Sequence, residues 1–300
     1  MSGDATALAA AIRSGQRTAI EAMEASLASA AREASTGAIT YLDAEMGLAA
    51  AKTVDALRQA AAERFDAMPF AGIPTLAKDL GGPFAGLPVA AGSALFPRTG
   101  SGADSELAAR FRAAGLCPFG LTTSPEFGLS LASEPMIGPI CRNPLDPTRT
   151  AGGSSGGAAA AVAAGIVAIA HATDAGGSIR VPAACCGLVG LKPGRGVMPA
   201  GPSFRNHLGG IATELAVCRS VRDTASIFDA LRGNAKGPFA DPMMSDFDHG
   251  RLRIGVLLDT GAEYPTTPER LAAVEAAALA LEAEGHVVVP LAWRDFESDV

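Results

Sequence analysis

The chain has 300 residues, 48% of them hydrophobic, which is enough for one large domain or two ordinary ones with a sizeable core. Its net charge of −7 and isoelectric point near 5.2 argue against a nucleic-acid-binding face, because neutralising phosphates requires clustered lysines and arginines. Five cysteines without CxxC spacing and four scattered histidines indicate neither a disulfide framework nor a metal site. Adjacent Cys185 and Cys186 are expected to be small buried residues.

We expect a soluble, cytoplasmic protein that does not enter a membrane. The N-terminus shows no secretory signal, because charged residues such as Asp4 and Arg13 interrupt its apolar residues. The long uncharged run over residues 151–173 contains too much Gly, Ser and Ala to resemble a membrane span. The sequence leaves the oligomeric state open, with a homodimer as one candidate.

The N-terminal region, residues 1–65, is predicted to be helical. Apolar residues recur there at intervals of three and four, and Gly15 and Gly37 are candidate helix stops. Alanine-rich helices of this kind make good packing elements and say little about chemistry.

From about residue 70, short apolar runs broken by Gly and Pro favour the strands and crossover loops of an α/β core over residues 70–232. Ser105–Ala114 is predicted to be a helix and Leu116–Leu121 a strand. This alternation places polar strand ends at one edge of a mixed sheet. Residues 147–153 are expected to form a loop, and Arg222–Leu231 a helix.

The C-terminal portion, residues 251–300, reads as a βαβ unit after a mobile surface connection over residues 233–250. Leu252–Leu258 and His286–Leu291 are predicted strands. Between them, Glu269–Glu284 is predicted to be an amphipathic helix.

The most informative stretch runs from Thr150 to Pro193 and contains two glycine-flanked serine clusters, GGSSGG and GGS. Between the clusters, Gly157–Ala164 favours a buried helix and Ile166–Ala170 a buried strand. Glycine permits positive φ and close approach of other groups, so these turns present their hydroxyl and N–H groups rather than packing them away. A buried helix and strand with a polar, glycine-rich turn at each end suit an active site.

Each cluster has a chemical interpretation. Ser154 would lie at the start of a helix, where free N–H groups favour developing negative charge. The N–H groups of Ala175, Gly176, Gly177 and Ser178 would converge as an oxyanion hole on a carbonyl attacked by Ser178. On spacing alone, a pair of structural glycine turns remains an open alternative.

Two other motifs are weaker matches to the first cluster. The segment GSSGG fits the G-x-S-x-G nucleophile elbow with Ser155 as nucleophile, but that motif needs an immediately preceding strand and a later acid and histidine. A phosphate-binding glycine loop needs Gly-Lys-Ser/Thr after the glycines, and none follows.

A family resemblance favours the catalytic interpretation. GGSSGG followed by TDAGGSIRVPAACCGLVGLKP resembles the amidase signature family of serine amidohydrolases, as do NPLDPTRTAGGSSGG, AGIPTLAKDL, TSPEFG and ELAVCRSVRDTASIFDAL. The resemblance implies the α/β amidase signature fold, a central twisted mixed β-sheet covered by helices on both faces with a helical N-terminal region. We expect residues 1–300 to form a single such domain. Since family members are usually longer, we expect it to be C-terminally incomplete.

Carried onto this sequence, the family's Ser-cisSer-Lys triad would comprise Ser178 as nucleophile, Ser154 as bridging serine on a cis peptide bond, and Lys78 as base. Lysine is a base only when neutral, so burial must lower its pKa from about 10.4 by several units. The apolar segment before it supplies that desolvation, and Asp79 is expected to point away from the amine.

Four further residues receive supporting roles. Ser155 and Thr173 are expected to hydrogen-bond the triad or its loops. Asp174 and Arg180 lie six residues apart across the Ser178 turn and are expected to be structural partners that brace it. Neither is expected to take part in the chemistry, because arginine cannot lose its proton and Asp174 lies beside the proposed oxyanion donors.

The resemblance therefore implies an amidohydrolase that cleaves small-molecule amides through an acyl-enzyme, with no metal or organic cofactor. The motif is most like that of the family's free hydrolases, including those acting on linear or cyclic amides of the nylon-oligomer (6-aminohexanoate cyclic dimer) type. Two alternatives remain: the A subunit of a glutamyl-tRNA amidotransferase, which releases ammonia for a partner subunit, and an inactive binding protein that has kept the fold.

Overall fold

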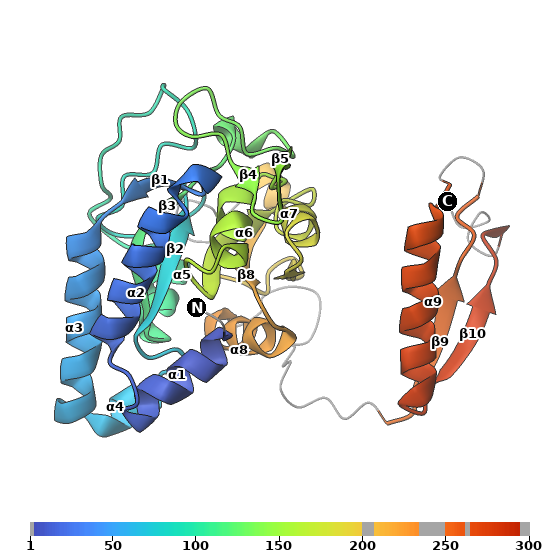
Figure 1. Ribbon diagram of the computed structural model, residues 1–300, viewed down its shortest axis with the longest axis horizontal. Helices are drawn as coiled ribbons and strands as arrows, with labels where there is room; N and C mark the ends of the chain where they lie inside the picture. Colours follow the sequence, from blue (N-terminus) through green and yellow to red (C-terminus); the bar gives the residue numbers. More distant parts are fainter. Residues whose placement is uncertain (1–2, 200–206, 234–249, 262–264, 295–300) are drawn as a thin grey trace. The chain divides into compact units, whose positions relative to one another are not determined.

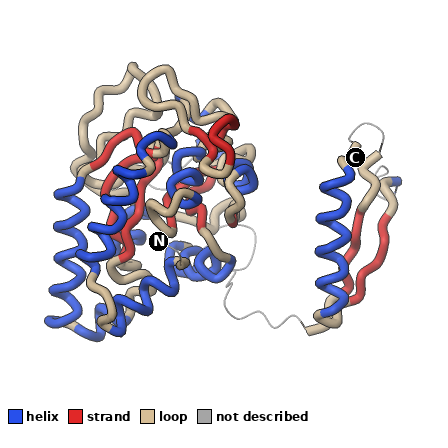
Figure 2. Tube along the Cα trace, in the orientation of Figure 1, coloured by secondary structure: helices blue, strands red, loops and turns tan. Residues whose placement is uncertain are grey.

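The computed structural model describes residues 3–199, 207–233, 250–261 and 265–294. The chain divides into two units, Met1–Ser245 and Asp246–Val300. Figure 1 labels their elements and Figure 2 separates helices from strands. The helices are α1 (Ala5–Ser14), α2 (Ala19–Arg32), α3 (Ala44–Ala60), α4 (Ala62–Asp66), α5 (Glu106–Ala113), α6 (Gly156–Ala163), α7 (Arg180–Cys185), α8 (Val221–Leu231) and α9 (Pro268–Ala283), with short 3-10 turns η1 (Ala34–Thr36), η2 (Glu126–Gly128) and η3 (His207–Gly210). The strands are β1 (Ile39–Leu42), β2 (Ile73–Lys78), β3 (Leu116–Thr122), β4 (Arg142–Asn143), β5 (Asp146–Thr150), β6 (Ile169–Asp174), β7 (Val189–Gly190), β8 (Thr213–Cys218), β9 (Arg253–Leu257) and β10 (Val287–Leu291).

The N-terminal helices begin where the sequence offers capping side chains. Asp4, Thr18 and Asp43 each accept a hydrogen bond from a main-chain N–H in the first turn of α1, α2 and α3. Gly15 ends α1 in the left-handed conformation, with φ +79°. The predicted helices of this region are therefore confirmed.

The larger unit is built on a mixed six-stranded sheet in the order β1-β3-β2-β6-β8-β7. Strand β2 lies parallel to both β3 and β6, whereas β1, β8 and β7 join antiparallel to their neighbours. Side chains point alternately to the two faces of a strand, and every residue of β2, β3, β6 and β8 is buried. Both faces of the sheet are therefore covered, and the predicted α/β fold is confirmed.

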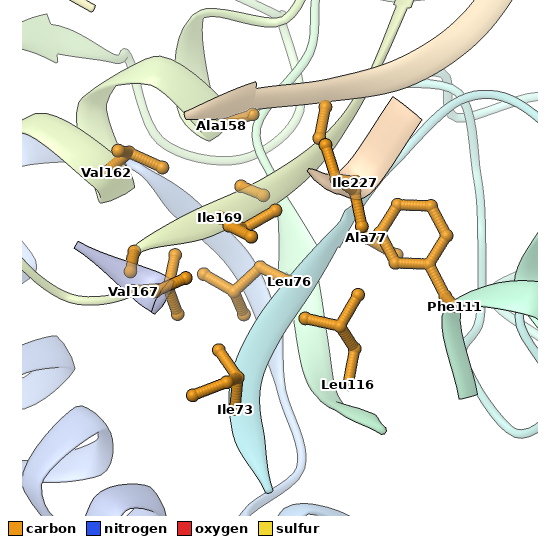
Figure 3. Packing of buried hydrophobic residues seen from close by; sticks show 14 of the residues in the cluster. Ile73, Leu76, Ala77, Phe111, Leu116, Ala158, Val162, Val167, Ile169 and Ile227 are labelled. Atoms are coloured by element: carbon orange, nitrogen blue, oxygen red, sulfur yellow. The ribbon is translucent and has the colours of Figure 1, made fainter. Parts of the chain in front are cut away.

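The core of this unit joins the central strands to the helices that flank them. Figure 3 shows Leu76 of β2 and Ile169 of β6 among the buried side chains, together with Val162 of α6. Small residues bring α6 close to the sheet: a Cβ on Gly157 would lie 2.4 Å from the main-chain nitrogen of Thr123. That contact fixes the start of α6 beside the end of β3.

Several predictions about this unit were wrong in detail. The helix-like region 1–65 contains strand β1. The strand predicted at Ile166–Ala170 lies instead at Ile169–Asp174, because Gly165 ends α6 at φ +76° and the next residues serve as a connection. Residues 147–153 were predicted to be a loop, but β5 pairs with β4 in a small hairpin. Cys186 is buried, whereas Cys185 is exposed.

The smaller unit contains the predicted βαβ arrangement. Strands β9 and β10 are parallel and in register from Arg253↔Val287 to Leu257↔Leu291, with α9 between them in sequence. Pro268 occupies the first turn of α9, where its missing N–H costs nothing. Helix α9 is present as predicted; none of its residues is fully buried, and Leu271, Ala278 and Leu281 are half-buried. The connection predicted at 233–250 lies almost wholly outside the described residues.

Candidate active site

The residue with the most unusual environment is Lys78, the last residue of β2. Its side chain is fully buried, and Nζ donates hydrogen bonds to Ser154 Oγ at 2.7 Å and Thr173 Oγ1 at 2.9 Å. Burial disfavours the ammonium and lowers the pKa of Lys78 to about 7, against the opposing charges of Glu214 and Asp174. An amine in this state can accept a proton near neutral pH.

Strands β2 and β6 are parallel, so their carboxyl ends lie at the same edge of the sheet, which places Lys78 beside Thr173. The first serine cluster, at the start of α6, meets Lys78 at this edge through Ser154. The peptide bond between Gly153 and Ser154 is cis, as the family resemblance implies. Ser133, which no sequence motif indicated, holds this turn: its hydroxyl donates to the Ser154 carbonyl at 3.2 Å and accepts from the Gly156 N–H at 3.0 Å.

Ser155 ties the two clusters together. Its N–H donates to the Ser178 carbonyl at 3.1 Å, and its hydroxyl donates to the Thr173 carbonyl at 3.2 Å. Ser178 is half-buried, and its hydroxyl makes no hydrogen bond within the described residues. The structure thus joins Lys78 and Ser154 directly, but connects them to Ser178 through the main chain.

Asp174 braces the Ser178 turn. This fully buried carboxylate accepts hydrogen bonds from the Gly177 N–H at 2.7 Å and the Ile179 N–H at 3.1 Å, and pairs with the Arg180 guanidinium at 2.9 and 3.0 Å. These hydrogen bonds hold its pKa below the usual range despite burial. The structural partnership predicted for Asp174 and Arg180 is present.

The predicted oxyanion donors are not equivalent. The prediction was wrong for Gly177: its N–H donates to the Asp174 carboxylate and is not a free donor. The N–H groups of Ala175, Gly176 and Ser178 donate to no acceptor in the described ranges. Gly176 is exposed, so this side of the turn is open to a ligand.

Asp79 points away from the amine, as expected. Its buried carboxylate accepts from the N–H groups of Ala90 and Gly92 at 2.7 and 3.2 Å, and Arg98 lies 3.1 Å away. This carboxylate orders the loop that follows β2 and leaves Lys78 without an ion-pair partner on its own element.

Two buried titratable residues close to Lys78 were missed. His171 on β6 and Glu214 on β8 contact each other at 3.1 Å, and His171 also contacts the Lys78 main chain. The sequence did carry a signal for them: a histidine lies within IAHATD and a glutamate within TELAVC, both of which are strand-like segments. Titratable side chains are rarely fully buried without partners, so two of them in buried strands could have been expected to pair.

Other classes of site find no support in the part of the chain that the structure describes. No group of three or more His, Cys, Asp or Glu side chains in it is arranged to hold a metal ion. None of its helices is both long and apolar enough to cross a membrane.

The family model described as Amidase matches residues 21–299. A Mycobacterium tuberculosis protein named as an amidase, AmiC, is 40% identical over 294 residues, covering 95% of this chain and 59% of that protein. The 6-aminohexanoate-cyclic-dimer hydrolase of Paenarthrobacter ureafaciens is 36% identical over 298 residues, covering 95% and 58%.

A solved structure is similar throughout the chain. The structure of a 6-aminohexanoate cyclic dimer hydrolase complexed with substrate matches with a TM-score of 0.86 at 34% identity, covering 96% of this chain and 60% of that one. The chain therefore spans about three fifths of the length of the relatives it matches.

Proposed function

Because this chain belongs to the amidase signature family, we propose that it hydrolyses the carbon–nitrogen bond of carboxylic amides through an acyl-enzyme on Ser178. The observation that carries the proposal is the buried Lys78 amine, 2.7 Å from Ser154 Oγ, with its pKa lowered to about 7. A buried lysine without an ion pair is costly to the fold, and such perturbed groups cluster at functional sites.

In the first step, Lys78 acts as the general base through Ser154. In the neutral amine that the reaction needs, one hydrogen continues to Thr173 Oγ1 and the hydrogen bond to Ser154 reverses, so that the Ser154 hydroxyl donates to the lone pair of Nζ. Lys78 takes the Ser154 proton while Ser154 takes the Ser178 proton. The Ser178 oxygen then bonds to the amide carbon, and the negative charge moves to the carbonyl oxygen.

The N–H groups of Ala175, Gly176 and Ser178 receive that oxyanion. The proton then returns from Lys78 through Ser154 to the amide nitrogen, the carbon–nitrogen bond breaks and the amine leaves. Water then attacks the resulting ester while Ser154 takes its proton and passes one to Lys78. That proton returns through Ser154 to the Ser178 oxygen as the ester bond breaks, which releases the acid and restores the Ser178 hydroxyl. Every proton removed in acylation is thus returned.

The substrate class we propose is a small linear or cyclic amide. This rests on the likeness to an enzyme named for hydrolysing the cyclic dimer of 6-aminohexanoate. The amidotransferase-subunit alternative makes a separate prediction, ammonia release from glutamine. Comparing the two substrates on the same preparation distinguishes a free amidase from an ammonia-supplying subunit.

The site itself is tested by labelling the purified chain with a fluorophosphonate and locating the adduct by peptide mass mapping. We expect the adduct on Ser178, no adduct in Ser178→Ala, and strongly slowed labelling in Lys78→Ala. Circular dichroism verifies that each variant is folded. A folded protein in which Ser178 stays unlabelled, or labels equally fast without Lys78, contradicts the proposed roles.

A further inference from the structure

His171 and Glu214 are two buried titratable residues that the proposed reaction does not use. Their exposed fractions are 1% and 2%. His171 lies on β6 with the rings of Phe84 and Phe111 packed against it, at centroid distances of 5.2 and 5.7 Å. A polar pair this deeply buried needs a structural or chemical reason.

The His171 imidazole takes the place of a main-chain acceptor at the end of the pairing between β2 and β6. Pairing between β2 and β6 ends at Leu76↔Ala170. The Asp79 N–H then donates to the β3 side, at Thr122, so the preceding N–H faces β6. That Lys78 N–H donates to His171 Nδ1 at 3.1 Å, which fixes the main chain of Lys78 just where its side chain leaves the strand.

The hydrogen bonds also determine the tautomer. Because Nδ1 accepts from the Lys78 N–H, the imidazole proton must lie on Nε2, which donates to Glu214 Oε1 at 3.1 Å. Glu214 Oε1 also accepts from the Gly82 N–H at 2.8 Å. The chain of contacts runs from the loop after β2, through Glu214 and His171, back to Lys78.

Glu214 also lies close to the Lys78 side chain. It is the register partner of Thr173, whose hydroxyl accepts from Lys78 Nζ. The charged groups around Lys78 are few: Asp174 on β6 is held by Arg180, and Asp79 is turned toward Arg98. Glu214 has no arginine or lysine partner in the described residues, so its charge is the one least offset near the amine.

We propose that His171 and Glu214 form a positioning pair for Lys78, in which the imidazole fixes the Lys78 main chain and the carboxylate fixes the imidazole and places a negative charge near Nζ. This inference rests on the proposed role of Lys78 as base. The pair never touches the reacting atoms. It sets the position of the amine and opposes the loss of its proton, so that desolvation does not lower its basicity further.

The charge is tested with Glu214→Gln, which keeps an oxygen acceptor and removes the negative charge. Glu214 raises the pKa of Lys78, so its removal should move the pH midpoint of Ser178 labelling down by about one pH unit. A merely structural defect would slow labelling at every pH without that shift. Glu106→Gln makes the same charge change on the exposed face of α5 and should leave the midpoint unchanged. An unmoved or raised midpoint in Glu214→Gln overturns the inference.

The hydrogen bond is tested with two replacements of His171. Asparagine offers an amide oxygen near the position of Nδ1, whereas leucine offers none. We expect His171→Leu to slow labelling about tenfold at the pH plateau and His171→Asn to recover most of that loss. Equal rates in the two variants, both folded by circular dichroism, contradict the positioning role.

A measurement on the unaltered site guards against variants that fail to fold. In a chain that keeps only His171, with the other three histidines replaced by glutamine, nitrogen NMR should show the proton on Nε2. A proton on Nδ1 overturns the inference. If instead Ser178 is never labelled in the parent chain, the proposed function fails first, and the two failures are thereby distinguishable.

Discussion

Replacing Lys78 with methionine is expected to change stability by an amount that depends on pH. The pKa of Lys78 falls from 10.5 in the unfolded chain to about 7 in the fold. Between these values the unfolded chain binds one more proton than the folded protein, so the free energy of unfolding rises with pH. Lys78 therefore destabilises the fold most below pH 7, and that penalty disappears above pH 10.5.

The magnitude follows from the two pKa values. Their separation corresponds to a penalty of roughly 5 kcal/mol at low pH, of which about 3 kcal/mol is removed between about pH 6 and pH 9. Methionine matches the unbranched shape of lysine but leaves the hydroxyls of Ser154 and Thr173 without an amine partner, which is a cost that does not depend on pH. The advantage of Lys78→Met over the parent should shrink by about 3 kcal/mol over that range.

Urea unfolding followed by circular dichroism at three pH values measures this difference. Groups shared by the two proteins cancel in the comparison. Lys52→Met on α3 is the matched control, because Lys52 is exposed and its replacement should give a difference that stays constant with pH. If Lys78→Met and the parent keep a constant difference from about pH 6 to pH 9, Lys78 is not desolvated in the way that the structure indicates.

Two further predictions concern the turns around the amine. Asp174→Asn removes the charge that holds the Gly177 N–H and the Arg180 guanidinium. It should lower the free energy of unfolding by about 2 kcal/mol, measured by thermal unfolding, and slow the labelling of Ser178. Gly81→Ala should destabilise by about 2 kcal/mol or more, because φ is +124° and the new Cβ would lie 2.3 Å from Glu214 Oε1. Gly102→Ala, which has nothing within 4 Å, is the control and should change the melting temperature little.

The elements that the sequence predicted well are those with strong local signals. Helix α5 lies between the cap residue Ser105 and Gly115, and both ends were predicted within one residue. Strand β3 is buried along its whole length and contains no charged residue. These signals require no knowledge of distant partners, because capping and periodicity act within a few residues.

Strands β1 and β8 were missed for the opposite reason. Residues Ile39–Leu42 form only a short strand between helices, and its identity depends on pairing with β3, far along the chain. Strand β8 contains Glu214, which lowers strand propensity and is accommodated only because His171 and the Gly82 N–H meet it. Pairing partners that are distant in sequence cannot be read from a local pattern.

The same limit separates the predicted from the missed site contacts. Thr173, Asp174 and Arg180 belong to one continuous motif, so their contacts with the serine turns could be expected from the sequence. The contacts of Ser133 and of the His171–Glu214 pair join segments from different parts of the chain. Neither residue type nor spacing predicts such a contact, because the groups are brought together by the pairing of strands that are distant in sequence.

The basicity of Lys78 is a property of the whole sheet rather than of its immediate neighbours. Desolvation is the largest influence on its pKa, and it exists because β2 is covered on both faces. A substitution that opens the core near β2 would admit water and return the pKa toward 10.5, so that fewer molecules hold a neutral amine at pH 7. Core packing and acid–base behaviour are therefore coupled: the burial that destabilises the fold through Lys78 is the same burial that lowers the pKa of its amine to about 7.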